Sequence, residues 1–392
     1  MILTGLDVCV ANGFSALKGK RVGAIVNQTS VDRELHHLVE LFAASRTVEL
    51  SCLFAPEHGI RGSAQYMEPV EEARDPHTGL PVFSLYGSTA ESLSPKRQWL
   101  HGLDALVFDI QDVGSRYYTY LNTMALSMKV AAEVGIPFHV LDRPNPIGGI
   151  EVEGNLVGKR FRSFVGMFAL PNRHGMTAGE LAQYLNETEH FGSELSIVRC
   201  SGWRRSQHWD QTGLPFVPPS PNMPTADTAL VYPGMCLSEG TNLSEGRGTC
   251  RPFEQFGAPW LDGDRLAREL NQQKLPGVRF RPVWFRPSFD KHQGVTCGGA
   301  MIHVIDRQTF RPVRTGVAVI KAVHDLGGDQ FQWRTDAYEF VTDIPAFDLL
   351  CGTDGVRSGI ERGAPLAELV EGFETELEPF LDKKSRHELY PR

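Results

Sequence analysis

The segment "RVGAIVNQTSVDRELHHLVELFAASRTVELSCLFA", residues 21–55, decides the fold class. It holds two apolar, β-branched runs at 21–28 and 48–55, and between them a stretch at 33–45 with the apolar spacing of a helix. Two strands joined by a helix pair in parallel, and near-continuous apolar strands indicate a sheet covered on both faces. We therefore expect a buried parallel sheet at the start of the chain.

The same alternation continues toward residue 200. Further strands are expected at 80–87, 104–112, 137–144 and 195–200, and further helices at 120–135 and 174–187. In the last helix, Thr177 and Glu180 have the spacing of a capping box, which marks a helix start. This order predicts an α/β fold with a Rossmann-like, doubly wound, mainly parallel sheet.

The rhythm breaks at residues 210–258, a stretch rich in proline and glycine. Irregular segments this long inside a compact protein are usually functional or disordered, and the aromatic residues here argue against disorder. The sequence that follows has an α+β pattern, and 392 residues suggest two domains. We predict a Rossmann-like catalytic domain at 1–258, including a long active-site loop at 210–258, and a smaller α+β auxiliary domain at 259–392.

The composition limits the binding partners and the cellular compartment that we expect. A net charge of −8 argues against nucleic acid, and no apolar run approaches the ~20 residues of a membrane span. The seven cysteines are scattered without a C-x-x-C, which favours a reducing compartment over a disulfide framework or a zinc site. The N-terminus lacks the pattern of a signal peptide, so we expect a cytoplasmic protein, although an exported, processed form stays open.

Polar residues follow four of the expected strands. In an open parallel sheet, ligands bind beyond the carboxyl ends of the strands, so these residues predict a polar site at one edge. Taken singly, each acid could equally be a helix cap with no catalytic role. Asp112 and Arg116 are spaced i, i+4 and could form a structural ion pair. The residues concerned are Asn27, Gln28, Glu57, His58, Asp109, Gln111, Asp112, Asp142, Arg143 and Asn145.

The stretch "LFAPEHGIRG", residues 53–62, stands out among these strand ends. Glycine and proline suffice to make a turn, so the acid Glu57, the base His58 and the cation Arg61 point to chemistry. Nucleotide and metal motifs are missing from the sequence: no G-x-G-x-x-G follows a strand, and there is no Walker A, H-E-x-x-H or G-x-S-x-G. We expect no cofactor and no metal. Carboxylates beside aromatic residues are typical of glycoside hydrolysis.

Several long blocks resemble one known family. They include "VNQTSVD" (26–32), "LFAPEHGIRG" (53–62), "VFDIQDVGSRYYTY" (107–120), "VLDRPNPIGG" (140–149), "RHGMTAGELA" (173–182), "PPSPNMPT" (218–225) and "EGTNLSEGRGTCRPFEQFGAPW" (239–260). Together they resemble the bacterial exo-β-N-acetylmuramidases of peptidoglycan recycling, glycoside hydrolase family 171, over nearly the whole chain. The resemblance implies a Rossmann-like domain, a smaller auxiliary domain and an active cleft between them.

The resemblance also implies an activity and a catalytic residue. The activity is release of N-acetylmuramic acid (MurNAc) from the non-reducing end of peptidoglycan fragments such as the MurNAc–GlcNAc disaccharide. The favoured catalytic residue of the family's E-H-G block is Glu57 here, which we interpret as the general acid. The second catalytic participant has two possible identities. The substrate's own 2-acetamido group could attack the anomeric carbon, oriented by Asp112 or Asp109, or one of these two acids could be the base that activates a water molecule. Glu239 and Glu245 of the long loop are further candidates.

The lactyl carboxylate of MurNAc calls for a guanidinium. Arg61, Arg116, Arg143 and Arg247 are the available arginines, and we prefer Arg61 and Arg247. Tyr117, Tyr118 and Trp203 are the expected sugar platform. The other expected substrate-binding residues are Asn27, His58, Asp109, Asp142, Arg143, Asn145 and His174.

Two alternative functions, neither of them that of a cofactor-free glycosidase, stay open at this point. The protein would bind muropeptides or another acidic sugar without turnover, or it would be a metal-dependent hydrolase that uses Asp109, Asp142 and His174. The second alternative suits the sequence less, because the spacing of these residues is not typical of a metal site.

Overall fold

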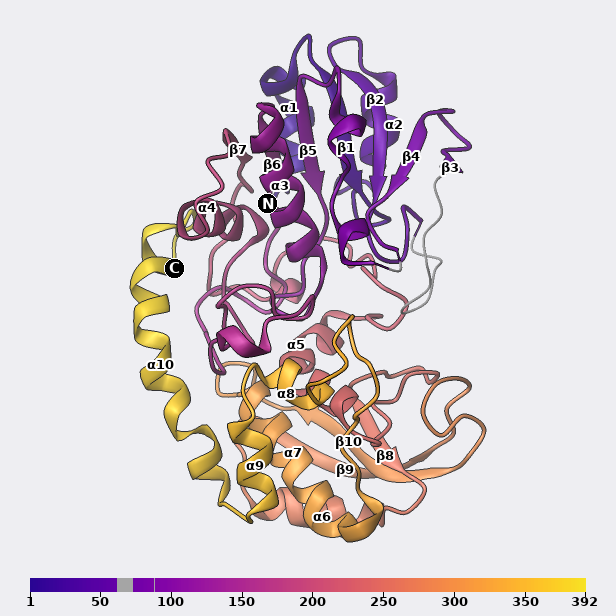
Figure 1. Ribbon diagram of the computed structural model, residues 1–392, viewed down its shortest axis with the longest axis vertical. Coiled ribbons are helices and arrows are strands. Elements are labelled where there is room, and N and C mark those ends of the chain that lie inside the picture. The colour runs from indigo at the N-terminus through magenta and orange to yellow at the C-terminus, as the bar shows by residue number, and fades with distance from the viewer. Residues whose placement is uncertain (62–72, 88) are drawn as a thin grey trace.

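The computed structural model describes residues 1–61, 73–87 and 89–392. Figure 1 shows two lobes, one built on a large sheet and the other on a small sheet, with a long C-terminal helix running alongside both. Gly62, the last residue of the E-H-G stretch, lies outside the described residues. The predicted fold class, a Rossmann-like sheet with a second, smaller α+β unit, is confirmed.

The large sheet has seven strands in the order β3-β4-β2-β1-β5-β6-β7. Six of them are parallel, and β3 pairs antiparallel with β4 at one edge. The order reverses between β1 and β5, as in doubly wound folds. The strands are β1 (Arg21–Val26), β2 (Glu49–Ala55), β3 (Ala73–Arg74), β4 (Pro81–Ser84), β5 (Ala105–Asp109), β6 (Phe138–Leu141) and β7 (Leu195–Val198).

Helices cover both faces of this sheet. Alternate residues of β1 face opposite cores: Val22, Ala24 and Val26 pack with α1 (Gly5–Ala11) and α2 (Leu38–Ala44). Ile25 belongs to the core that also holds residues of α3 (Tyr120–Val134) and α4 (Ala178–Thr188). The capping box predicted at Thr177 and Glu180 is present at the start of α4.

The second lobe has an antiparallel sheet in the order β8-β10-β9, from β8 (Gln255–Ala258), β9 (Val278–Phe285) and β10 (Cys297–Val304). Helix α6 (Gly263–Gln272) contacts this sheet. Helices α5 (Ala226–Met235) and α7 (Pro312–Gly327) cross at two glycines, where a Cβ on Gly234 would lie 1.9 Å from the Pro312 carbonyl oxygen. Thus α5 and β8, which precede the predicted boundary at residue 258, pack with elements that follow it.

The remaining α-helices lie in the C-terminal part of the chain. Helices α8 (Ala346–Cys351) and α9 (Gly355–Glu361) belong to the second lobe, and α10 (Leu366–Arg386) runs back toward the large sheet (Figure 1). The tail after α10 is held there, because Leu389 N donates to Glu180 and the Tyr390 hydroxyl donates to Asp142. Short 3₁₀ helices lie at Ser15–Leu17, Ala90–Leu93, Arg97–Leu100, Lys159–Phe161, Trp209–Gln211, Cys236–Gly240 and Gly328–Gln330. Within the described ranges, no helix has the length and apolarity needed to cross a bilayer.

Candidate active site

Glu57 lies in a tight turn directly after β2. The Gly59 amide donates to the Pro56 carbonyl at 3.0 Å, and both His58 and Gly59 have positive φ, 68° and 78°. A non-glycine residue in this region is uncommon and is often found at functional sites. The turn places the Glu57 carboxyl at the carboxyl edge of the sheet, where it is 7% exposed. There it accepts a hydrogen bond of 2.6 Å from the Thr119 hydroxyl.

The turn opens on a cavity of about 50 Å³, here called the narrow cavity. Its walls come from the turn after β2, from the segment before and at the start of α3, from the long loop and from the second lobe, so it lies between the lobes. It is lined by Glu57, His58, Tyr117, Tyr118, Thr119, Tyr120, Val165, Ser220, Asn222, Met223, Tyr232, Cys236, Glu239, Arg247, Phe253, Tyr338 and Glu339.

A second carboxylate, Glu239, lines the same cavity and is held by two donors. Arg247 Nη2 lies 2.8 Å from one of its oxygens, and the Tyr338 hydroxyl donates to the other at 2.8 Å. Burial lowers the pKa of the Arg247 guanidinium, but Glu239 and Glu245 outweigh burial and raise it well above its ordinary value. Arg247 is therefore firmly charged and donates to Glu239.

Glu245 extends this network away from Glu57. Its carboxylate lies 3.1 Å from Arg247 Nε and 2.9 Å from Lys291 Nζ. Burial raises the pKa of Glu245, but Lys291 and Arg247 more than offset burial, so the pKa lies below its ordinary value. Glu245 is thus an ionised carboxylate whose oxygens are both engaged by cations.

Next to the narrow cavity is a larger one of about 550 Å³, here called the wide cavity. The two cavities share Glu239 and Arg247 and therefore adjoin. The wide cavity is lined by Glu239, Thr241, Asn242, Glu245, Arg247, Asp290, Lys291, His292, Gln332, Trp333, Arg334, Thr335 and Asp336. Its walls are polar and carry both signs of charge, as expected for a site that receives a polar ligand.

The structure brings seven of the expected site residues to these cavities. Six line the narrow cavity, and Glu245 lines the wide one. The six are Glu57, His58, Tyr117, Tyr118, Glu239 and Arg247. Tyr117 is largely turned into the core, since its hydroxyl donates to the Pro233 carbonyl at 3.0 Å.

Asp109 and Arg143 pair with each other and line neither of these cavities. Arg143 donates to both oxygens of Asp109, through Nη2 at 2.9 Å, and the two side chains are 0% and 4% exposed. Burial raises the pKa of Asp109, and the attraction of Arg143 offsets part of that rise. Asn27, at the neighbouring strand end, accepts hydrogen bonds from the amide and the hydroxyl of Thr29. These residues shape the turns after β1, β5 and β6.

Asp142 and Asn145 hold backbone and tail instead of facing either cavity. Asp142 accepts hydrogen bonds from the Thr177 hydroxyl at 2.7 Å, from Gly179 N at 2.8 Å and from the Tyr390 hydroxyl. Burial raises its pKa to about 6. The Asn145 amide donates to the Met176 carbonyl at 2.9 Å. Both residues thus support the start of α4.

Asp112 and His174 form a separate buried contact, with Oδ2 and Nε2 3.4 Å apart. Asp112 also accepts from Gly114 N at 2.7 Å. The alternative metal site at Asp109, Asp142 and His174 does not form, because each of the three has its own partners. No three His, Cys, Asp or Glu side chains within residues 1–61, 73–87 and 89–392 are placed to hold a metal ion.

The other expected cations and the tryptophan also have structural partners. Arg116 is buried and donates to the carbonyls of Asn155, Leu170 and Leu350, so it does not pair with Asp112. Arg61 lies 3.2 Å from Asp75. Trp203 packs edge-on against Tyr390, with ring centroids 5.1 Å apart, in a core cluster that includes Ile2 and Trp209.

Several residues of the narrow cavity were not predicted. Thr119 and Tyr120 belong to the block at 107–120, and Ser220 and Asn222 to the block at 218–225, so the same blocks could have indicated them. Tyr338 lies in a stretch without periodicity or motif, and no sequence signal pointed to it.

Comparison with known proteins identifies the family. Residues 22–227 match the family described as "Exo-beta-N-acetylmuramidase NamZ, N-terminal", and residues 230–390 match its C-terminal counterpart. The chain is 43% identical over 389 residues to the peptidoglycan beta-N-acetylmuramidase NamZ of Bacillus subtilis strain 168. That match covers 99% of this chain and 91% of the relative.

Two solved structures of DUF1343 family proteins from Bacteroides fragilis have the same fold. One has a TM-score of 0.89 at 35% identity, covering 99% of each chain. The other has a TM-score of 0.77 at 29% identity and covers 100% of this chain and 99% of its own. The resemblance seen in the sequence is confirmed: the chain belongs to the exo-β-N-acetylmuramidase NamZ family and is a glycosidase.

Proposed function

We propose that this enzyme releases MurNAc from the non-reducing end of peptidoglycan fragments such as MurNAc–GlcNAc, with Glu57 as the general acid. The family membership and the name of the Bacillus subtilis relative support the substrate class. One observation carries the mechanism: Glu57 and Glu239 line the same cavity in different electrostatic environments.

The surroundings of Glu57 suit a proton donor. Its carboxyl is buried among aromatic side chains and is fixed by the neutral Thr119 hydroxyl. Within the described residues, no cation forms an ion pair with the Glu57 carboxyl. A buried carboxyl in such a setting is suited to protonate a leaving group.

In the part of the chain that the structure describes, Glu239, in contrast to Glu57, has a cation as a direct partner. Arg247 and the Tyr338 hydroxyl both stabilise its carboxylate. Glycoside hydrolysis passes through a transition state with positive charge at the anomeric carbon, and an ionised carboxylate nearby lowers its energy. Pairs of acids whose environments differ in this way take different roles in catalysis.

The proposed reaction begins with protonation of the leaving group. The Glu57 carboxyl proton passes to the glycosidic oxygen as the bond from that oxygen to the anomeric carbon breaks. The anomeric carbon gains positive charge, which the Glu239 carboxylate stabilises. Water then adds to the anomeric carbon and returns a proton to Glu57, so that MurNAc and the shortened fragment leave.

The test compares Glu57→Gln and Glu239→Gln on MurNAc glycosides with a range of leaving groups. Loss of a general acid costs about 10²- to 10⁴-fold, and the loss shrinks as the leaving group becomes more acidic and needs less protonation. Glu57→Gln should therefore recover on a nitrophenyl glycoside, whereas Glu239→Gln should remain impaired on every substrate. If Glu57→Gln turns over a poor leaving group at the wild-type rate, the acid is another residue.

A further inference from the structure

The narrow cavity contains a buried hydrogen-bond donor without a partner in the described part of the chain. Asn222 lines this cavity beside Glu57 and is 6% exposed. Its amide nitrogen Nδ2 has no hydrogen-bond partner among the residues that the structure describes. Buried side-chain amides are nearly always hydrogen-bonded, because an unsatisfied donor destabilises the fold. Such a donor in a catalytic cavity indicates an acceptor on the ligand.

The rest of the cavity narrows the kind of acceptor. Val165, Met223 and Phe253 line it as well, so apolar surface lies in the same small space as the unpaired donor. A volume of about 50 Å³ holds a few water molecules or one small substituent, so we place the sugar ring where this cavity adjoins the wide cavity, at Glu239. The space therefore suits a short group with a carbonyl oxygen and a methyl.

We propose that Asn222 donates from Nδ2 to the oxygen of the 2-acetamido group of MurNAc, whose methyl packs on Val165, Met223 and Phe253. This inference rests on the proposed function. The 2-acetamido group is on the carbon next to the anomeric carbon, so it must lie close to Glu57, which shares the cavity. A ring hydroxyl would also accept the hydrogen bond, but it would leave the apolar surface without a partner.

The test uses binding of MurNAc and of muramic acid, which has an amine in place of the acetamido group. In calorimetry, wild-type enzyme should bind MurNAc at least about tenfold more tightly than muramic acid, which is the difference expected for one satisfied buried hydrogen bond. In Asn222→Leu the ratio of the dissociation constant of muramic acid to that of MurNAc should fall toward one, and in the isosteric Asn222→Asp it should fall further, because a carboxylate cannot donate to the acetamido oxygen and attracts the ammonium of muramic acid. The melting temperature of Asn222→Leu should stay level or rise, because the unpaired donor is gone.

A matched control is Asn186→Leu. The Asn186 side chain exchanges two hydrogen bonds with the Ser193 backbone, at 2.9 and 3.0 Å. This substitution should lower the melting temperature and leave the ligand ratio unchanged. The proposal is overturned if both Asn222 variants keep the wild-type ratio, or if Asn222→Leu destabilises the protein as Asn186→Leu does. Binding needs no turnover, so a failure of wild type to hydrolyse MurNAc glycosides would overturn the function and leave this test intact.

A different observation concerns the lactyl group of MurNAc. Arg334 lines the wide cavity, and its guanidinium lies 4.9 Å from the centroid of the Tyr338 ring. Within the described part of the chain, Arg334 has neither an ion pair nor a side-chain hydrogen bond. By contrast, Arg247 is enclosed by Glu239 and Glu245, where an incoming carboxylate would meet like charges. Arg334 is thus a cation of the described cavity wall that has room for an anion.

We infer that Arg334 pairs with the lactyl carboxylate of MurNAc. The lactyl ether is on the ring carbon next to the acetamido group. With that group in the narrow cavity, the lactyl group reaches the adjoining wide cavity, whose wall includes Arg334. Stacking on Tyr338 fixes the plane of the guanidinium for a bidentate contact.

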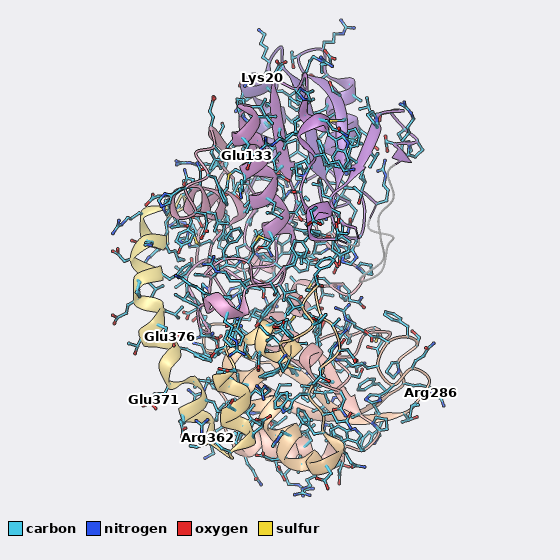
Figure 2. All side chains as sticks on the ribbon, in the orientation of Figure 1. Lys20, Glu133, Arg286, Arg362, Glu371 and Glu376 are labelled. Atoms are coloured by element: carbon cyan, nitrogen blue, oxygen red, sulfur yellow. The ribbon has the colours of Figure 1, made fainter. Side chains whose placement is uncertain are left out.

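The measurement compares the dissociation constants of MurNAc and GlcNAc, which differ by the lactyl group. A charge-assisted hydrogen bond predicts that Arg334→Gln weakens MurNAc binding about 10- to 100-fold and changes GlcNAc binding less than about twofold. The control is Arg286→Gln, because Arg286 is exposed and projects from the outer edge of the second lobe (Figure 2). Equal losses for both sugars, or no loss for MurNAc, would show that another residue binds the carboxylate.

Discussion

At the carboxyl ends of β5 and β6 the polar side chains pair with one another, whereas at the end of β2 Glu57 faces a cavity. Asp109 and Asp142 are both 0% exposed and engage Arg143, Thr177 and Tyr390. Glu57 is nearly as buried, but the second carboxylate of its cavity, Glu239, comes from the second lobe. The carboxyl edge of the sheet thus has two parts. In the closed part, at β5 and β6, the polar side chains are paired by the fold; in the open part, at β2, the site is completed by residues of the second lobe.

The difference teaches how to separate structural from catalytic strand ends. In the closed part, each carboxylate has enough donors from the fold, so no ligand is needed to satisfy it. In the open part, the described residues give the Glu57 carboxyl one neutral donor, Thr119, and give the Asn222 amide nitrogen in the same cavity no partner. For the carboxylates Asp109, Asp142 and Glu57, the number of hydrogen-bond donors supplied by the fold, and not burial alone, distinguishes the two parts.

The largest effect is expected from breaking the closed part. Arg143→Met leaves Asp109 buried without its cation, and removing one partner of a buried pair costs about 3–5 kcal/mol. We expect the free energy of unfolding in urea to fall by that amount, while kcat/KM per folded molecule stays within about twofold of wild type. A specific loss of kcat/KM with unchanged stability would instead place Arg143 at the substrate.

A smaller effect is expected from Asp142 and depends on pH. Burial raises its pKa from 3.8 to about 6, so the folded protein holds this proton more tightly than the unfolded chain. Its contribution to stability is complete below about pH 4 and is lost as the pH rises through about 6, a change of about 3 kcal/mol.

Asp142→Asn cannot titrate, so its stability should lack this component. The measurement is urea unfolding of wild type and Asp142→Asn at pH 4 and pH 7. Between pH 4 and pH 7, the stability of wild type should fall relative to that of Asp142→Asn by about 2 kcal/mol, most of the full change. Parallel pH profiles would contradict the raised pKa.

The smallest effect is expected at Arg61, on the rim of the open part. It pairs with Asp75 at 3.2 Å, and its side chain is 43% exposed. Asp75 is buried but keeps hydrogen bonds from the Thr78 amide and hydroxyl, and the arginine is open to solvent, so Arg61→Gln should lower the free energy of unfolding by about 1 kcal/mol or less. We also expect the preference for MurNAc over GlcNAc to stay within about twofold, because Arg334 is proposed to bind the lactyl group. A collapse of that preference in Arg61→Gln would restore Arg61 as the lactyl cation.

Local sequence determined the elements and the place of Glu57. The apolar runs and helical spacing of residues 21–55 specify strand, helix and strand, because side-chain periodicity must match the backbone repeat. The capping box at Thr177 and Glu180 marks the start of α4 from four residues alone. The turn at Pro56–Gly59 then puts Glu57 at the edge where parallel strands end.

Tertiary structure alone decided which polar residues share the site with Glu57. Asp109 and Asp142 carry the same local signal as Glu57, yet packing gives them partners from neighbouring strands, from α4 and from the C-terminal tail. Tyr338 and Arg334 carry no local signal and reach the cavities because the second lobe folds against the sheet edge. Such contacts join distant parts of the chain, and their energy depends on complementary packing of two lobes, which no short periodic pattern encodes.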